Sequence, residues 1–185
     1  MATATQPLAG TYAVDAVHSS FGFAVKYMGV TTFKGTLDDV DATLTAGPDG
    51  ASLQGAANVE SISIHTPEQF RQHVLGDDFF AADTYPQVTF RSDAVELADD
   101  GSATVVGQLT IRDVTKTVTA TGSWSPEAEL FGSRKAALAI SAVIDRTDYG
   151  LNWNAELPTG GKALANDVTL TIELTLLAQG AGQEA

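Results

Sequence analysis

The sequence predicts an all-β protein in which antiparallel strands close into a barrel around an apolar interior. The first observation is an alternating segment at residues 20–27, where every second position carries a bulky apolar or aromatic side chain: Phe21, Phe23, Val25 and Tyr27. Successive strand side chains point to opposite faces, so this segment has one apolar face and one wetter face. The second observation is that similar segments follow one another along almost the whole chain and are joined by short turns. Strands connected in this way favour an antiparallel sheet that curls until its two edges meet.

Apolar positions spaced two apart predict nine strand segments: residues 11–15, 19–27, 32–45, 52–64, 87–97, 104–112, 116–124, 135–145 and 167–178. In two of the longer segments the apolar positions change parity, after Leu37 in one and after Val59 in the other. A change of parity moves the apolar side chains to the opposite face of the strand. Each change therefore predicts a bulge or a sharp bend.

Residues 67–75 depart from the alternation and predict one short helix. Thr66 is a typical N-cap residue, Pro67 would take the first helical position, and Gln69 follows the cap by three residues. We expect this helix and the loop after it to lie over one end of the barrel and to close it with apolar side chains: Phe70, Val74, Phe79 and Phe80.

Composition limits the classes of function. The 185 residues, of which 44% are hydrophobic, are enough for one compact domain. Ten Lys and Arg against 23 Asp and Glu give a net charge of -13, which opposes binding to nucleic-acid phosphates and to anionic membrane surfaces. The chain has no cysteine, which excludes disulfides, thiolate zinc sites and thiol catalysis.

The ends of the chain carry little pattern. Residues 1–10 show neither a basic start nor an apolar run of signal-peptide length, and no stretch approaches the roughly 20 apolar residues of a membrane span. We therefore expect a cytoplasmic protein without stable membrane insertion. We expect one barrel domain over residues 10–178, with flexible termini at residues 1–9 and 179–185.

Several short motifs occur in a distinctive order along residues 10–178. Four of them are Asp15-Ala16-Val17-His18-Ser19, Tyr85-Pro86-Gln87-Val88-Thr89-Phe90, Gly107-Gln108-Leu109-Thr110-Ile111-Arg112-Asp113 and Asp145-Arg146-Thr147-Asp148-Tyr149-Gly150. In their order and spacing the chain resembles the YceI-like family of lipid-binding proteins. One departure is Asp113, where members of the family often carry Gly. Because Asp tolerates a left-handed turn better than most residues, we expect the hairpin to form.

The resemblance implies an extended, lipocalin-like antiparallel barrel of about eight strands with an elongated cavity. It also implies a ligand, an isoprenoid, an isoprenoid quinone precursor or a fatty-acid-like lipid, which the protein would carry or store. Residue periodicity by itself indicates only an apolar interior, and a barrel of this size has room for side chains or for one small ligand. Each buried methylene of a ligand contributes about 0.8 kcal/mol before ordering costs, so a hydrophobic tube could hold a long tail without strong polar contacts.

We expect twelve side chains to form the cavity wall, with small residues between them that leave room for a chain: Phe21, Phe23, Val25, Phe33, Phe70, Val74, Phe79, Phe80, Phe90, Ile140, Ile144 and Trp153. The alternative for each is an ordinary core residue. For the ligand head group we consider His18, Arg71 and His73, of which Arg71 could hold a phosphate with two hydrogen bonds. The alternatives are a turn residue bonded to Asp15 for His18 and a solvated helix face for the other two.

Catalysis finds little support in the sequence. The three histidines lack metal-ligand spacing, and the chain contains no nucleophile elbow, phosphate-binding loop or dinucleotide fingerprint, so we expect no catalytic residues, no metal and no cofactor. For Arg146 we favour a structural role at the barrel rim, through Asp148 or a cap. Two alternative functions stay open. One is an enzyme that modifies a quinone or lipid precursor in the same pocket. The other is a protein-interaction or homodimer module that uses the outer face of residues 135–145.

Overall fold

The computed structural model describes residues 8–180. Residues 1–7 and 181–185, which make up most of the predicted flexible termini, lie outside the described residues. Within residues 8–180, no helix is both long and apolar enough to cross a membrane.

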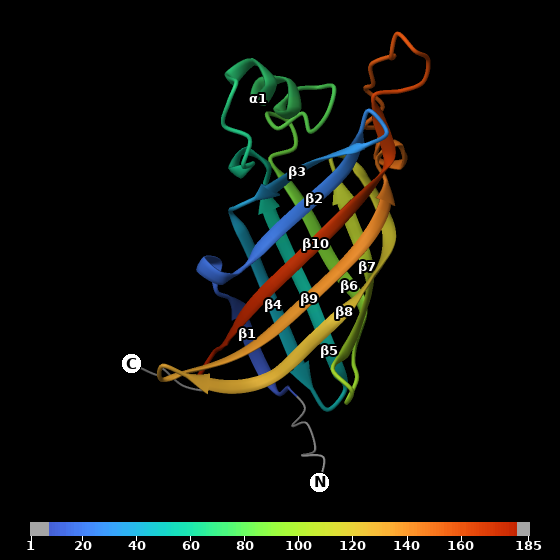
Figure 1. The fold of residues 1–185 in the computed structure, drawn as a ribbon. Helices are drawn as coiled ribbons and strands as arrows, with labels where there is room; N and C mark the ends of the chain where they lie inside the picture. The colour runs from blue at the N-terminus through green and yellow to red at the C-terminus, as the bar shows by residue number, and fades with distance from the viewer. Residues whose placement is uncertain (1–7, 181–185) are drawn as a thin grey trace.

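The described residues form ten strands, one α-helix and three single-turn 3-10 helices (Figure 1). In chain order they are β1 (Gly10–Val14), η1 (Ala16–His18), β2 (Ser20–Tyr27), β3 (Thr31–Leu37), β4 (Val40–Gly47), β5 (Gly50–Asn58), η2 (Val59–Ser61), α1 (Glu68–Leu75), β6 (Gln87–Leu97), β7 (Ser102–Ile111), β8 (Val114–Leu130), β9 (Ser133–Asp145), η3 (Arg146–Tyr149) and β10 (Leu164–Ala178).

The strands form a closed antiparallel barrel, as the sequence predicts. Strands β4 to β10 pair in chain order, and β10 then pairs with β1 through Tyr12 and Ala178, which closes the sheet. Strands β1 and β2 form one bent strand interrupted by η1, and β3 and β4 form a second one, so the barrel has eight strands. This closure through β1 and β10 removes the free edges in one half of the sheet, whereas β3 pairs along its length with β2 alone.

Both predicted bends are present. The first lies at Asp38 and Asp39, between β3 and β4. The second lies at Val59, where β5 has already ended and η2 begins, so the strand predicted to continue to residue 64 is wrong beyond Asn58. Only Ile62 returns to the sheet, as an isolated bridge to Leu37.

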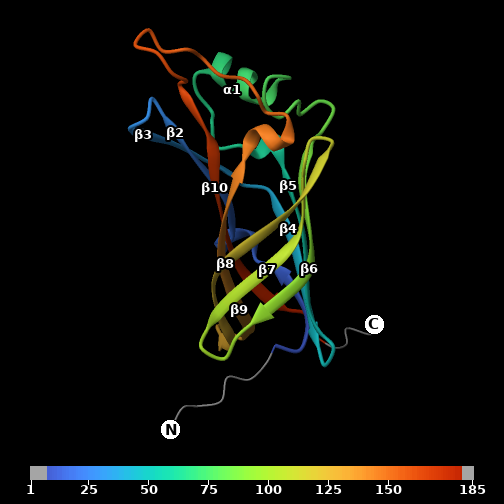
Figure 2. The ribbon, with the colours of Figure 1, turned by 90° about the vertical axis from the view of Figure 1, so that its right-hand side faces the viewer.

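The predicted helix is confirmed, with a different start. The helix α1 begins at Glu68 with Pro67 as its N-cap, and no side chain caps it, so the predicted capping role of Thr66 is wrong. Figures 1 and 2 show α1 at the end of the barrel where β10 begins. We call this end the upper end.

The expectation for the β7–β8 hairpin was wrong in one detail. The left-handed residue is Arg112, with φ 58°, and not Asp113. Arg112 Nη1 donates to the carbonyl oxygens of Asp77 and Phe79 at 3.3 and 3.4 Å. The turn thereby holds the loop after α1 against the barrel.

The interior has two hydrophobic clusters, one in each half of the barrel. The lower cluster contains five large side chains that are almost completely buried: Tyr12, Leu44, Val105, Leu138 and Leu176. The upper cluster includes Leu37, Val59 and Ile62 and extends to the helix α1.

A group of charges joins the bend after β1 to strand β9. Asp15 Oδ2 lies 3.0 Å from Lys135 Nζ and 2.9 Å from His18 Nδ1, and Asp15 Oδ1 accepts a hydrogen bond from the backbone N–H of Val17. The hydrogen bonds from His18 and then Lys135 lower the pKa of Asp15 from 3.8 to about 2. The ionised carboxylate is therefore the form that the fold stabilises.

Replacing Asp15 by Asn tests this stabilisation through its pH dependence. The pKa of Asp15 is lowered in the folded state, so its contribution to the unfolding free energy is present above about pH 4 and is lost as the pH falls toward 2. We expect Asp15→Asn to be less stable than the parent at pH 6 to 7, and the two proteins to converge below about pH 3. Urea unfolding at several pH values measures this, with Asp49→Asn in the exposed β4–β5 turn as the control. A stability difference that does not change with pH would contradict the account.

A candidate ligand-binding cavity in the upper half of the barrel

The upper half of the barrel encloses a cavity of about 430 Å³. Its wall is almost entirely apolar and is contributed by β2, β3, α1 and the following loop, β6, β7, β9, the η3 region and β10: Phe21, Phe23, Val25, Tyr27, Phe33, Phe70, His73, Val74, Phe79, Phe80, Val88, Ile111, Ile144, Arg146, Tyr149, Leu151, Trp153, Leu164, Val168 and Leu170. Two of these side chains, Tyr27 and Phe70, are also exposed at the surface, so the cavity opens between the β2–β3 hairpin and α1.

Aromatic contacts order the wall near this opening. The ring of Phe33 lies 6.0 Å from that of Phe23 and 5.7 Å from that of Phe70, the latter in an edge-to-face arrangement. Across the opening, the ring of Trp153 lies 4.8 Å from that of His73 and 5.5 Å from that of Phe79. Such contacts hold large flat side chains in fixed positions.

Gly35 makes room for one of these rings. A Cβ atom at this position would lie only 2.9 Å from Cε1 of Phe23, closer than real Cβ contacts allow. The absence of a side chain on β3 therefore lets the Phe23 ring lie against the backbone of the neighbouring strand.

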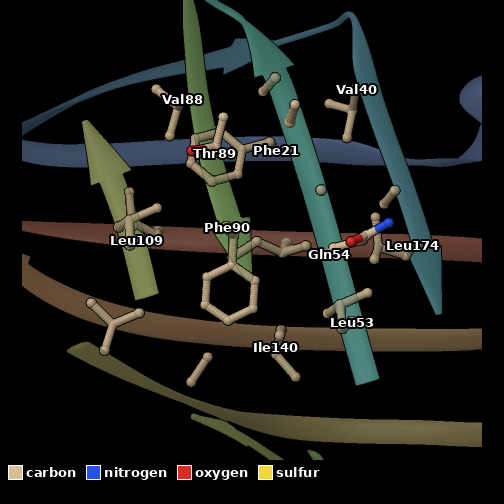
Figure 3. Close-up of a pocket in the computed structure, with 18 of the residues that line it drawn as sticks. Phe21, Val40, Leu53, Gln54, Val88, Thr89, Phe90, Leu109, Ile140 and Leu174 are labelled. Atoms are coloured by element: carbon tan, nitrogen blue, oxygen red, sulfur yellow. The ribbon is translucent and has the colours of Figure 1, made fainter. Parts of the chain in front are cut away.

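A second, smaller cavity of about 80 Å³ lies deeper in the barrel (Figure 3). Phe21, Val88 and Leu170 line both cavities and form the boundary between them. Phe90 and Ile140 line the smaller cavity, and both are labelled in Figure 3. Below it, the buried side chains of Tyr12, Leu138 and Leu176 line neither cavity, so the elongated cavity that the resemblance implies does not reach the lower end of the barrel.

The structure brings the twelve predicted wall residues to these two cavities. Ten of them line the upper cavity, and only Phe90 and Ile140 lie in the smaller one instead. Their contact with a ligand stays a prediction. Sequence reasoning missed Val168 and Leu170, although both follow the alternation of β10, and it missed Tyr149 because the motif around it was interpreted as structural.

The three predicted head-group residues do not lie together. Arg71 lies outside the upper cavity, and its guanidinium donates hydrogen bonds to the carbonyl oxygens of Glu60, Ile62 and Ile64 at 2.7, 3.1 and 3.0 Å. His18 is exposed at the bend after β1 and bonded to Asp15, as the alternative interpretation has it. His73 alone of the three lines the cavity.

Arg146 is a buried cation beside the cavity that pairs with backbone oxygens. It donates to the carbonyls of Leu151, Trp153 and Ala165, the last two at 2.8 and 2.9 Å. The structure shows no ion pair between Arg146 and a carboxylate in residues 8–180. Burial lowers its pKa, and the nearby Asp145 opposes this effect. Its guanidinium therefore fixes the loop that carries Trp153 and does not pair with Asp148.

Comparison with known proteins identifies the family. The YceI-like domain matches residues 12–176. The chain belongs to the YceI-like family. UPF0312 proteins of Staphylococcus aureus strains MSSA476 and MW2 are each 30% identical to it over 161 residues, which cover 85% of this chain and 91% of theirs.

Solved structures share the YceI-like barrel. BcnA of Burkholderia cenocepacia superposes with a TM-score of 0.71 at 25% identity, over 88% of this chain and 98% of that chain. The YCEI protein of Campylobacter jejuni gives 0.68 at 24% identity, over 84% and 90%. A polyisoprenoid binding domain from Saccharophagus degradans, implicated in plant cell wall breakdown, gives 0.65 at 18% identity, over 91% and 98%, and shows the shared fold.

In this YceI-like barrel, Tyr149 is the wall residue with an unpaired polar atom. The side chain is almost fully buried, and its hydroxyl has no hydrogen-bond partner among the described residues. Burial, and secondarily the charge of Asp148, raises its pKa to about 12, so the hydroxyl is neutral at physiological pH. No cluster of three His, Asp or Glu side chains in residues 8–180 could hold a metal ion.

Tyr149→Phe should stabilise the lipid-free protein. A buried hydroxyl without a partner costs about 1 to 3 kcal/mol, so we expect its removal to raise the unfolding free energy by about 1 kcal/mol in urea titrations. The matched control is Tyr12→Phe. The Tyr12 side chain is equally buried, but its hydroxyl donates to Glu127 Oε2 at 3.0 Å, so we expect its removal to lower the unfolding free energy. Equal losses of stability in the two variants would show that Tyr149 is in fact hydrogen-bonded.

Proposed function

We propose that this protein binds one long-chain amphiphile, an isoprenoid or a fatty-acid-like lipid, and carries or stores it without chemical change. The observation that carries the proposal is the upper cavity of about 430 Å³ with its nearly uniform apolar wall. This volume lies within the roughly 300–1,000 Å³ range typical of small-molecule sites. A packed core would leave only a few voids larger than a water molecule.

The apolar tail would lie along the wall and the polar end would stay near the opening. A tail that enters between Tyr27 and Phe70 passes the aromatic rings and reaches the boundary at Phe21. Burial of each methylene contributes about 0.8 kcal/mol, so a tail of modest length supplies most of the binding free energy. The boundary at Phe21, Val88 and Leu170 limits how deep a tail can reach without displacing these side chains.

For the polar end of the ligand we propose His73 as the nearest partner. It lines the cavity, contacts Trp153 and Phe79 through its ring, and has Asp78 Oδ2 at 3.6 Å from its Nδ1. An imidazole held in this way can donate or accept one hydrogen bond to a carbonyl or hydroxyl group. The guanidinium of Arg71 is hydrogen-bonded to backbone carbonyls, so Arg71 would stabilise the segment beside the opening and would not bind the ligand.

The comparisons support the ligand class in general terms. A protein described as a polyisoprenoid binding domain has the same fold over 98% of its own chain. The residues around the cavity favour binding over catalysis, because the guanidinium of Arg146 is engaged with carbonyls and the wall is otherwise apolar apart from Tyr27, His73 and Tyr149. A homodimer through the outer face of β9 stays a prediction.

Filling the cavity tests the proposed function. Ile144 is buried in the cavity wall, whereas its neighbour Val143 is 65% exposed on the outer face of the same strand. We expect Ile144→Trp to displace two or three methylenes of a tail and to weaken binding of a fluorescent prenyl or fatty-acid probe by roughly tenfold or more. Val143→Trp should bind the probe like the parent.

The bound material itself provides the complementary measurement. Mass spectrometry of an organic extract should find a long-chain amphiphile with the purified parent protein and much less of it with Ile144→Trp. Equal probe affinity in both tryptophan variants, or an extract without any amphiphile together with no probe binding, would contradict the proposed function.

A further inference from the structure

The tip of the β2–β3 hairpin exposes apolar side chains where a turn usually carries polar ones. Met28 is 54% and Val30 is 80% exposed, on either side of Gly29. Tight turns ordinarily carry Gly, Asn, Asp, Pro or Ser, for reasons of backbone conformation and hydrogen bonding. The tip is also anchored, since the backbone N–H of Met28 donates to the carbonyl of Ala163 at 2.8 Å. These side chains are therefore presented to solvent by a fixed turn.

The exposed tip is continuous with the cavity wall. Tyr27 directly precedes Met28, and its side chain lines the upper cavity. Phe70 of α1 also lines the cavity, and both side chains are exposed at the surface. We call Tyr27, Met28, Val30 and Phe70 the mouth lip. The mouth lip forms a contiguous apolar path from the surface into the cavity. Apolar residues that are scattered singly over a surface form no such path.

Positive charge lies beside the mouth lip in an otherwise acidic protein. Lys26 and Lys34 are exposed on the outer face of the β2–β3 hairpin, and neither forms a salt bridge in the described part of the chain. The chain has only ten Lys and Arg residues, and its net charge is -13. Two free lysines next to an apolar tip match the anionic headgroups and the acyl region of a bilayer surface.

We propose that the mouth lip docks transiently on an anionic phospholipid bilayer, so that a tail passes between the bilayer and the cavity without crossing water. This inference rests on the proposed function, because it concerns how the same cavity is loaded. A long tail that leaves a membrane through water exposes its apolar surface, which is unfavourable and slows its release. Direct contact between the mouth lip and the bilayer would remove this barrier to transfer. The net charge of -13 opposes approach to an anionic surface, so docking depends on the local charges of Lys26 and Lys34 and on the apolar mouth lip.

The test uses two matched hairpin-tip variants. Met28→Ser with Val30→Ser changes the mouth lip, and Leu130→Ser with Phe131→Ser changes the β8–β9 tip at the other end of the barrel (Figure 1). The turns are alike: Met28 and Gly29 have φ 52° and 75°, and Phe131 and Gly132 have φ 50° and 76°. Leu130 and Phe131 are 52% and 96% exposed, so both variants change surface side chains and both should fold.

The measured quantity is the rate at which lipid-stripped protein takes up a fluorescent prenyl probe from vesicles of phosphatidylcholine and phosphatidylglycerol. We expect the mouth-lip variant to slow this uptake by about tenfold, as loss of two apolar anchors implies, and the β8–β9 variant to match the parent. Probe affinity without vesicles should be equal in all three proteins. Added salt, or Lys26→Gln with Lys34→Gln, should also slow uptake.

Each outcome bears on one proposal. Uptake at parental rate by the mouth-lip variant, or equal slowing by both variants, would overturn membrane docking and leave the proposed function intact. Absence of probe binding by the parent protein with and without vesicles would instead overturn the proposed function. Slower uptake by the mouth-lip variant alone, with unchanged affinity in solution, supports docking.

Discussion

The whole structure depends on one strand, β10, which pairs along one edge with β9 and along the other with two different strands. Its first part pairs with β2 and its last part with β1, because η1 bends the chain between them. In the lower half this pairing closes the barrel tightly around the large side chains of Tyr12, Leu138 and Leu176. In the upper half β3 pairs with β2 alone, apart from the single bridge from Leu37 to Ile62, so the sheet leaves an opening there.

The segment after β5 occupies this opening, and the cavity follows from that arrangement. Backbone hydrogen bonds tie Ser63 to Thr36 and Val59 to Pro86. The guanidinium of Arg71 binds three carbonyl oxygens of the same segment, those of Glu60, Ile62 and Ile64. The segment is thus pinned by its backbone while α1 contributes Phe70, His73 and Val74 to the wall. A wall made from an irregular segment and α1 spans a wider interior than paired strands would, which explains why the larger cavity lies in the upper half of the barrel.

Much of this architecture could be predicted from the alternation of apolar residues, because a period of two fixes which face of a strand each side chain occupies. The bends after Leu37 and at Val59 were predicted for the same reason, as were wall residues such as Phe23 and Ile144. The alternation could not show that the larger cavity lies in the upper half, since this depends on which strands pair with β10 in each half of the barrel. The roles of Arg71 and Arg146 were equally hidden, because both bind backbone carbonyls, which carry no residue-specific signal in a sequence.

The central claim is that an apolar tail lies inside the upper half of the barrel and not on its surface or in its lower half. Intermolecular nuclear Overhauser effects between farnesol and methyl-labelled protein test this claim most directly. The account predicts contacts from the farnesyl methyls to Val25, Ile144 and Val168, and none to Val105 or Leu138 in the lower cluster. Contacts confined to the exposed methyls of Val143, or to the lower cluster, would contradict it.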